Sequence, residues 1–508
     1  MTYSPENTTP RGTDYHDPGL HHTPCDKREL LSQFLTFLPK NAVLSEPEDL
    51  HPYECDGLSA FRHLPMMVVL PESVAQVQQI MRVCYERRVP VIARGAGTGL
   101  SGSALPDDHS VLLSLSKLNR ILELDPLSRT ARIEPGVRNL AITEAASQYG
   151  LYYAPDPSSQ IACSIGGNVA ENSGGVHCLK YGLTVHNVLA LKVVMVTGEL
   201  LHIGSGALDS PGYHLLALMH GSEGMLGIVV EVLVKLVPKP NDIQVLLITF
   251  DDVAQAGRAV NTIIESGILP SGLEMMDQLA IRAAEDFCHA GYPTDVAAIL
   301  LCELDGTTEE VDEHVKKVEQ LMQNCGALAV RVAKTEAERI LFWKGRKSAF
   351  PAVGRLSPDY YCMDGTIPRR HLAAVLTRLN ELSQEYNLPI ANVFHAGDGN
   401  LHPLIMYDAN IPGELARTEE LGGKILTLCV EMGGTITGEH GVGVEKINQM
   451  CDQFASAELQ QFHAIKEAFD PLRLLNPGKA VPTLHRCAEL GAMHVHHNQL
   501  PHSDLPRF

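Results

Sequence analysis

Two short glycine-rich segments in the C-terminal half carry side chains suited to metal binding and proton transfer. The first, H-A-G-D-G-N-L-H, places His395 and His402 seven residues apart. The second, G-E-H-G-V-G, adds Glu439 and His440 about forty residues later. Three imidazoles and nearby carboxylates can hold one divalent metal and leave a base free. A lone histidine is more often a surface or satisfied core residue, but this dense pattern favours a catalytic cluster.

A second kind of chemistry is indicated by glycine-rich loops in the N-terminal half. The segment Arg94-Gly-Ala-Gly-Thr-Gly-Leu-Ser-Gly102 has four glycines in nine residues, which lets backbone N–H groups approach an anion. It lacks the helix and acidic partner of a dinucleotide fingerprint, and alone it is typical of a plain strand-to-loop turn. Two further loops, at 155–175 and 220–228, together predict one large polar ligand held mainly by backbone.

Composition limits the classes of function. A chain of 508 residues is expected to form two or three domains. No apolar run approaches the length of a membrane span, and the polar, proline-containing start lacks the apolar core of a secretion signal. The net charge of −20 opposes binding to nucleic acid or anionic lipid. The cysteines form no C-x-x-C pair, so no iron–sulfur cluster or thiolate zinc site is expected in this chain.

Hydrophobic periodicity predicts two successive α/β patterns separated near the prolines at 238 and 240. In the first we expect helices at 72–88 and 141–149 and strands at 89–93, 111–115, 130–133 and 189–197. In the second we expect strands at 245–250 and 298–303 and helices at 253–265 and 309–324, typical of a ferredoxin-like sheet. A turn-rich segment closes the chain before a histidine-rich tail, in which adventitious metal binding is the most we expect.

These motifs, in this order, resemble a known flavoenzyme family over about residues 40–482. The family shares the vanillyl-alcohol-oxidase or PCMH type of FAD-binding domain. The closest resemblance is to its branch of FAD-linked glycolate oxidase subunits and of D-lactate and D-2-hydroxyglutarate dehydrogenases. The resemblance implies an α+β fold with a PCMH-type FAD-binding domain of two α/β subdomains and a ferredoxin-like cap. The implied divisions are a flexible leader at 1–25, the FAD domain at 26–238, the cap at 239–465, a closing segment at 466–484 and a flexible tail at 485–508.

The resemblance also assigns the glycine-rich loops to the cofactor. It implies that the first loop wraps the FAD pyrophosphate, that the second lines the flavin, and that the third meets the adenine end. No histidine or cysteine stands out for covalent attachment, so non-covalent FAD is expected. The implied FAD-binding residues are Arg94, Gly95, Gly97, Thr98, Gly99, Ser101, Gly102, Pro157, Ser158, Ser159, Gly166, Gly167, Asn168, Asn172, Gly175, Gly227 and Ile228.

For the catalytic cluster the resemblance implies oxidation of a 2-hydroxy acid. His395, His402 and Glu439 match the metal ligands of the family, and His440 matches its general base. Zinc, manganese and iron all suit such ligands. Because neighbouring residues on a strand face opposite sides, Glu439 and His440 can share one site only in a turn or bulge, as the surrounding glycines allow. Asp398 and Asn400 would support the ligands from the loop.

The substrate carboxylate needs a cation. The segment Phe342-Trp-Lys-Gly-Arg-Lys347 matches the family pattern W-x-x-R, which implies that Arg346 binds the carboxylate. The alternative is a solvated helix face. Cys362 stands where 2-hydroxyglutarate enzymes have lysine, and Phe350 replaces a small polar residue. These departures favour a small acid, with glycolate oxidised to glyoxylate or D-lactate to pyruvate.

Electrons must leave the reduced flavin. The resemblance implies a second FAD-binding subunit and an iron–sulfur subunit, a quinone-type acceptor, and a cytoplasmic location with peripheral attachment to the inner membrane through these partners. The alternatives are a stand-alone D-lactate dehydrogenase, a metal hydrolase, and a flavin-binding subunit without chemistry.

Overall fold

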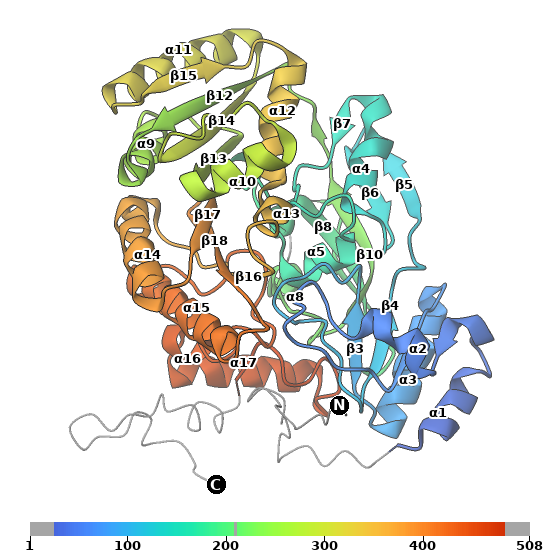
Figure 1. Ribbon diagram of the computed structural model, residues 1–508. Coiled ribbons are helices and arrows are strands. Elements are labelled where there is room, and N and C mark those ends of the chain that lie inside the picture. The colour runs from blue at the N-terminus through green and yellow to red at the C-terminus, as the bar shows by residue number, and fades with distance from the viewer. Residues whose placement is uncertain (1–24, 208–210, 483–508) are drawn as a thin grey trace.

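The computed structural model describes residues 25–207 and 211–482 (Figure 1). All but the last residue of the predicted leader, and the whole of the predicted tail, lie outside this part of the chain. No helix within it has the length and apolar character needed to cross a membrane.

The N-terminal half contains two sheets, seen on the right of Figure 1. In the first sheet, strands β2 and β3 run parallel to β4, and β1 pairs antiparallel with β2 at the edge. All strands of the second sheet are antiparallel. A short pair, β7 with β11, lies beside them. The first sheet has the order β1 (Val43–Leu44), β2 (Met67–Val69), β4 (Val111–Ser114), β3 (Val91–Arg94). The second has the order β5 (Ile121–Asp125), β6 (Thr130–Ile133), β10 (Ile228–Lys235), β8 (Val188–Val194), β9 (Leu200–Gly204), and the short pair is β7 (Leu151–Tyr152) and β11 (Val237–Pro238).

Each of these sheets has its own apolar core. Side chains of the long α3 helix pack with the first sheet, and those of α4, α5 and α8 pack with the second. Helix α3 begins at Ser73, whose hydroxyl accepts from the Gln76 amide, and ends at Arg88 in the left-handed conformation. The helices here are α1 (Lys27–Phe34), α2 (Pro47–Leu50), α3 (Val74–Arg87), α4 (Asn139–Ala146), α5 (Ile165–Glu171), α6 (Cys178–Tyr181), α7 (Thr184–Asn187) and α8 (Leu215–Met219).

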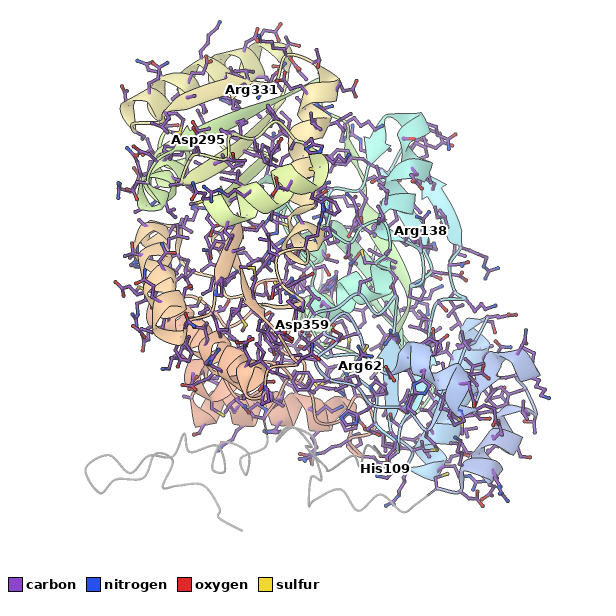
Figure 2. The ribbon with its side chains drawn as sticks, viewed as in Figure 1. Arg62, His109, Arg138, Asp295, Arg331 and Asp359 are labelled. Carbon is purple, nitrogen blue, oxygen red and sulfur yellow. The ribbon has the colours of Figure 1, made fainter. Side chains whose placement is uncertain are left out.

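The second half is built on one antiparallel sheet. Its first four strands, numbered along the chain, lie in the order 4-1-3-2, and β17, β18 and β16 extend the sheet beyond β13. Figure 2 labels Asp295 and Arg331 in the upper part of this half and Asp359 at the start of β16. The full order is β15 (Ala329–Val332), β12 (Asp242–Phe250), β14 (Ala298–Gly306), β13 (Gly272–Asp277), β17 (Ile390–His395), β18 (Asn400–Tyr407), β16 (Asp359–Cys362).

Helices cover both faces of this sheet. Alternate residues of β12 point to opposite sides, so Leu246 and Ile248 pack with α9, α11, α14 and α15, whereas Val245 and Leu247 pack with α10, α12 and α13. The strands therefore read as apolar runs because both faces are buried. The helices are α9 (Val253–Glu265), α10 (Gln278–Cys288), α11 (Thr308–Asn324), α12 (Glu336–Lys347), α13 (Ala349–Val353), α14 (Leu372–Tyr386), α15 (Glu414–Glu431), α16 (Met450–Gln453) and α17 (Ser456–Phe469).

The end of the chain returns to the first half. After α17, Leu475 bridges in parallel to Val91 of β3, and the Asn476 amide donates to Val91 O at 2.9 Å. The Asn476 side chain then donates to Ser103 O at 2.8 Å and to Glu223 O at 2.6 Å. The predicted boundary at 465/466 lies inside α17, and the end of this helix already contacts the first half, since the Lys466 ammonium donates to Met225 O at 2.8 Å.

A second link between the halves is an ionic cluster around His177. Its ring nitrogens lie 3.0 Å from Asp156 and 2.9 Å from Glu303 of β14, and the indole of Trp343 on α12 donates to Glu303 at 2.6 Å. Burial alone would lower the pKa of His177, but the two carboxylates raise it well above its usual value. The halves are thus joined by a charged imidazole between two anions.

Most predicted elements are confirmed to within a few residues. The strand at 130–133 and the helix at 253–265 have the predicted bounds, and the helix expected at 141–149 is α4 followed by a 3₁₀ turn at Ser147–Tyr149. The order 4-1-3-2 fits the predicted ferredoxin-like cap. The strands β16, β17 and β18 were not predicted, although β17 and β18 carry His395 and His402. Asn392 interrupts the apolar run of β17, and Pro403 interrupts that of β18.

We predict that Asn476→Ala destabilises the protein through the chain return. The change removes three buried hydrogen bonds, two donated to the carbonyls of Ser103 and Glu223 and one accepted from the Lys479 ammonium, and keeps a β-carbon at a position with φ of 43°. The free energy of unfolding should fall by about 2–4 kcal/mol in urea denaturation. The exposed Asn119→Ala should change it by less than about 0.5 kcal/mol, and equal effects of the two variants would contradict the assignment.

Candidate active site

One cavity of about 440 Å³ runs from the glycine-rich loops of the first half to the histidine cluster of the second. This volume is within the usual range for small-molecule sites. His402, Glu439 and His440 lie on its wall together with thirteen of the seventeen predicted FAD-binding residues. Those thirteen are Arg94, Gly95, Gly97, Thr98, Gly99, Pro157, Ser158, Ser159, Gly166, Gly167, Asn168, Gly227 and Ile228.

The first loop is shaped by a buried arginine beneath it. The Arg94 guanidinium donates to Cys55 O at 2.6 Å, and a β-carbon on Gly97, whose φ is 70°, would overlap it. Asp56 lies close to Arg94, but burial outweighs that charge and raises the pKa of Asp56 to about 6. The Arg94 guanidinium therefore braces the loop, and Gly95, Gly97 and Gly99 line the cavity beside it.

The second loop approaches the first so closely that side chains are excluded. Ser164 begins α5 by accepting from the Gly167 amide, and a β-carbon on Gly166 would lie 2.6 Å from Pro135. A β-carbon on Gly95 would overlap the Ser164 hydroxyl. The absence of side chains at these positions is what keeps the cavity open beside α5.

Four predicted FAD-binding residues lie behind the cavity wall. The Ser101 carbonyl accepts from the amides of Val444 and Glu445, and Gly102 packs against Val444. Asn172 ends α5 in the left-handed conformation, and its side chain accepts from the Val185 amide at 3.0 Å. Gly175, with φ of 141°, lets the backbone pass against Asp156. In this structure these four residues shape the loops.

The predicted metal ligands come together although they come from distant segments. His395 ends β17, His402 lies on β18, and Glu439 lies on the loop after α15. The His395 Nε2 and Glu439 Oε1 atoms are 3.1 Å apart, and His402 Nε2 lies 3.3 Å from the same oxygen. One ligand atom from each residue falls within 4.8 Å of the others, which is close enough for one ion.

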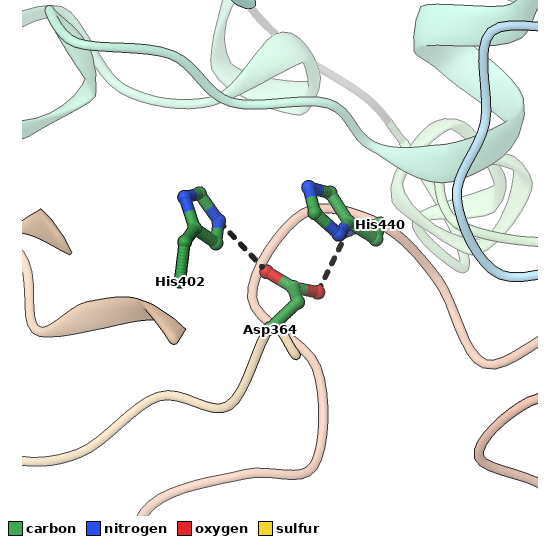
Figure 3. A group of neighbouring side chains, drawn as sticks. All are labelled: Asp364, His402 and His440. Atoms are coloured by element: carbon green, nitrogen blue, oxygen red, sulfur yellow. Dashed lines mark hydrogen bonds and ion pairs between the residues drawn. The ribbon is translucent and has the colours of Figure 1, made fainter. Parts of the chain in front are cut away.

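A carboxylate that sequence reasoning missed, Asp364, lies between His402 and His440 (Figure 3). Its Oδ1 atom is 3.4 Å from His402 Nε2, and Asp364, His402 and His440 form a second group that could hold an ion. The His402 and His440 rings stack with centroids 4.9 Å apart and planes 7° apart. His402 thus belongs to both groups.

Asp364 also builds the turn that the neighbouring Glu439 and His440 require. Its Oδ2 atom accepts from the amides of Gly438 at 3.0 Å, Glu439 at 3.2 Å and His440 at 2.9 Å. The buried Lys446 ammonium donates to the same oxygen at 3.2 Å. Three successive amides converging on one oxygen fold the backbone into a turn, so both side chains face the cavity.

A second carboxylate, Glu223, holds the other end of this turn from the FAD-binding half. It accepts from the amides of Val442 at 2.7 Å and Gly443 at 2.8 Å. Gly441 has φ of 83°, and a β-carbon there would overlap Glu171 of α5. The turn is therefore clamped between the two halves, with glycine required at its centre.

His395 is fixed from behind by another residue missed in the sequence, Glu274 of β13. The His395 Nδ1 atom lies 2.8 and 3.0 Å from the two Glu274 oxygens. The Arg346 Nη2 atom is 2.6 Å from Glu274 Oε2, and both side chains are 1% exposed. Arg346, the predicted carboxylate cation, is therefore buried beside the cluster and does not line the cavity, although its Nε and Nη1 atoms have no hydrogen-bond partner.

Burial and charge set the protonation of the cluster. Burial would raise the pKa of Glu439, but the hydrogen bond with His395 and the nearby imidazoles lower it to about 2. Burial lowers the pKa of His440 to about 4 against the opposing charge of Asp364. Glu439 is therefore ionised and His440 is neutral near pH 7, as a ligand and a proton acceptor must be.

The residues flanking the cluster narrow the cavity. Phe350 meets the His402 ring edge to face, with centroids 6.0 Å apart and ring planes at 68°, and Pro351 lies beside it on α13. Lys347, one residue after Arg346, lines the cavity, with its ammonium 3.6 Å from Asp156. Cys362 is buried in β16. Asp398 accepts from the Asn400 amide at 3.0 Å within the loop between β17 and β18.

Family models match both halves of the chain. A model described as "FAD binding domain" matches residues 65–204, and one described as "FAD linked oxidases, C-terminal domain" matches residues 239–480. The glycolate oxidase subunit GlcD of Escherichia coli strain K12 is 63% identical over 483 residues, covering 95% of this chain and 97% of that protein. The chain belongs to the FAD-linked oxidase family. A subunit of the same name from Bacillus subtilis is 39% identical over 84% of this chain and 91% of that protein.

Other relatives extend the comparison. A D-lactate dehydrogenase of Archaeoglobus fulgidus is 33% identical over 82% of this chain and 92% of that protein. The solved structure of p-cresol methylhydroxylase superposes with a TM-score of 0.77 at 19% identity, covering 90% of this chain and 97% of that one. The structure of a 4-ethylphenol oxidase from Gulosibacter chungangensis superposes with a TM-score of 0.76 at 18% identity, covering 90% of this chain and 98% of that one. The predicted PCMH-type fold is confirmed.

As a member of the FAD-linked oxidases the chain is an FAD-dependent oxidoreductase, and the cavity suits that cofactor. Glycine backbone lines it where any β-carbon at Gly166 would collide with Pro135, as a close-fitting cradle requires. The cluster also suits a divalent metal. Nδ1 of His402 and Nδ1 of His440 are buried without a hydrogen-bond partner, and Nε2 of His402 meets only carboxylate oxygens, at 3.3 and 3.4 Å, as expected for atoms that await a ligand.

We predict that Gly166→Ala weakens FAD binding. The new methyl would lie 2.6 Å from Pro135 Cβ, and the resulting shift of α5 would distort the cavity wall. An overpacking cost of about 1–3 kcal/mol corresponds to a roughly 5- to 150-fold higher Kd for FAD, measured by fluorescence quenching with flavin-stripped protein. Gly206→Ala, which meets open space, is the matched control. An unchanged Kd in Gly166→Ala would show that this close approach does not shape the cofactor site.

Proposed function

We propose that the chain is the FAD-bearing subunit that oxidises a small 2-hydroxy acid, with glycolate converted to glyoxylate or D-lactate to pyruvate. The observation that carries the proposal is the single cavity that joins the FAD-binding loops to His402, Glu439 and His440. The 63% identity to a glycolate oxidase subunit and the more distant D-lactate dehydrogenases support this substrate class. Family membership favours this function over a metal hydrolase.

The reaction removes a proton from the hydroxyl and a hydride from the α-carbon. FAD, when bound, supplies the hydride acceptor. His440 receives the hydroxyl proton, since its imidazole is neutral and faces the cavity from a turn that holds it rigidly. The acid must therefore lie between the His440 ring and the loops at 157–168, with its α-carbon toward the cofactor.

His395, His402 and Glu439 would hold a divalent metal, with Asp364 beside His402 as a further oxygen donor. A metal there would polarise the hydroxyl and carboxylate oxygens and so ease loss of the proton. The imidazole of His395 lies between Glu274 and Glu439, whose charges raise its pKa well above the usual value although burial lowers it. Because a metal would replace that proton, its binding would tighten as pH rises.

Arg346 remains our assignment for the substrate carboxylate. Its Nε and Nη1 donors are buried without partners, which is costly unless a ligand accepts from them. Phe350 and Pro351 restrict the space beside His402, and Cys362 offers no charge for a second carboxylate. A small monocarboxylate fits these surroundings better than a dicarboxylate.

Electrons would leave through partners. The printed name of the 63% identical relative is that of a subunit, which supports assembly with other chains. We propose a second FAD-binding subunit and an iron–sulfur subunit as those partners, non-covalent FAD in this chain, and a cytoplasmic location with peripheral attachment to the inner membrane through the complex. No role in binding nucleic acid is proposed.

We predict that His440→Ala keeps the flavin spectrum but slows anaerobic bleaching of the flavin by glycolate or D-lactate. Loss of a general base should lower the rate by about 10²–10⁴-fold in stopped-flow measurements. The exposed His202→Ala is the control and should bleach as the wild type does. Normal bleaching in His440→Ala would rule out its role as the base, and a wild-type flavin that neither acid bleaches would contradict the proposed function.

The two neighbouring cations can be separated by substitution. Arg346→Met should raise KM for the acid by about 10- to 150-fold, the effect of losing a charged hydrogen bond to a carboxylate. Lys347→Met should change KM by less than about fivefold, because its ammonium is a third exposed and already faces Asp156. Flavin content of both variants reports folding. If KM rose more in Lys347→Met than in Arg346→Met, Lys347 and not Arg346 would be the residue that binds the substrate carboxylate.

A further inference from the structure

Glu274 is a buried carboxylate between two core residues of β13. It lies in the middle of β13, its side chain is 1% exposed, and its neighbours Leu273 and Met275 are core residues. A buried carboxylate is costly unless cations or donors surround it. Here two groups do so, namely the His395 imidazole and the Arg346 guanidinium.

These two groups belong to different parts of the chemistry. His395 is a metal ligand and Arg346 is the carboxylate cation in the function proposed above, on which this step rests. They come from β17 and α12, which approach Glu274 from different elements. Figure 1 shows β17 beside β13 in the sheet and α12 running down toward the same region. No other acidic group is recorded within bonding distance of both side chains in residues 25–207 and 211–482.

We propose that Glu274 is a positioning residue that sets both the metal ligand and the substrate cation through one carboxylate. By accepting from Nδ1 of His395, it leaves Nε2, the nitrogen that faces Glu439, free to bind a metal. By binding only Nη2 of Arg346, it orients the guanidinium and leaves Nε and Nη1 for the acid. The spacing between hydroxyl and carboxylate sites is therefore fixed by a single rigid group on a strand.

The geometry requires both the charge and the length of this side chain. The Oε2 atom meets both partners and Oε1 meets His395 alone, so a glutamine amide would lose the negative charge and would turn its NH₂ group, a donor, toward one of these two donors. Aspartate would withdraw the carboxylate by one methylene from at least one partner. Either change would loosen the His395 ring and the Arg346 fork without touching the flavin cavity, since Glu274 does not line it.

The test measures two quantities for each variant. One is the Zn²⁺ affinity of the metal-stripped flavoprotein, and the other is KM for glycolate in steady-state kinetics. Glu274→Gln and Glu274→Asp should weaken Zn²⁺ binding by about 10- to 100-fold, as loss of other partners of metal-bound histidines does, and raise KM for glycolate. Arg346→Met should raise KM but weaken Zn²⁺ by less than about tenfold, because the His395–Glu274 bond remains. Only the glutamate variants should move both quantities.

A matched control separates this role from general loss of a buried charge. Glu134 pairs with Arg120 at 2.7 Å, is 4% exposed in its side chain and does not line the cavity, so Glu134→Gln should leave Zn²⁺ affinity unchanged. Retained flavin absorbance shows that each variant is folded, and Glu274→Asp provides the comparison if Glu274→Gln does not fold. Unchanged Zn²⁺ affinity or KM in the folded glutamate variants, or a wild-type chain that takes up no Zn²⁺, overturns the proposal. A wild-type flavin that the acids do not bleach contradicts the proposed function instead.

Discussion

The candidate active site depends on the bonds that the Asp364 carboxylate makes with three successive backbone amides. Asp364 and its partner Lys446 are fully buried, so these bonds act in a medium of low dielectric where each is strong and where losing one is costly. Without them, Glu439 and His440 would project to opposite sides of an extended chain. Glu439 and His440 therefore share a cavity because a third residue, about 75 positions earlier, determines the backbone conformation between them.

The same loop also joins the two halves of the molecule. Glu223 of the FAD-binding half accepts from Val442 and Gly443, and Asn476 of the returning chain donates to the carbonyl of Glu223 itself. The catalytic turn is thus bound on one side by the cap and on the other by the FAD-binding half. Reaction geometry in an oxidase of this kind needs the substrate cluster fixed relative to the flavin, and these direct bonds supply that constraint.

The sequence predicted the fold well where local patterns determine it. Helix α9 and strand β6 have the expected bounds because their periodicity and flanking residues are unambiguous. Most of the residues in the predicted FAD loops line the cavity, and they were visible in the sequence because glycine is conspicuous wherever backbone must approach a ligand. Ser101, Gly102, Asn172 and Gly175 were predicted together with them but do not line the cavity, because sequence cannot tell a glycine-rich loop facing a cavity from one that packs against another loop.

The supporting carboxylates were missed because each acts over a long sequence separation. Asp364 lies within a segment noted only for its cysteine, and nothing local pairs it with residues 438–440. Glu274 did carry a signal, since a charged residue between apolar residues of a buried strand is costly and must have partners. That signal says that partners exist but does not name them. Arg346 was recognisable in the sequence from its motif. Its burial against Glu274 was not predictable, because that contact depends on how α12 packs against β13.

The same kind of support holds each of the groups discussed above. Each group placed for chemistry, namely His395, Arg346, Glu439 and His440, is held by an anion that does not line the cavity or by a backbone turn built on one. Such anions would be destabilising alone, but the cations and amides that they orient compensate for their desolvation. The arrangement separates the groups that meet the substrate from those that fix their positions. Substrate preference can therefore change through residues such as Phe350 and Cys362 while the supporting carboxylates stay the same.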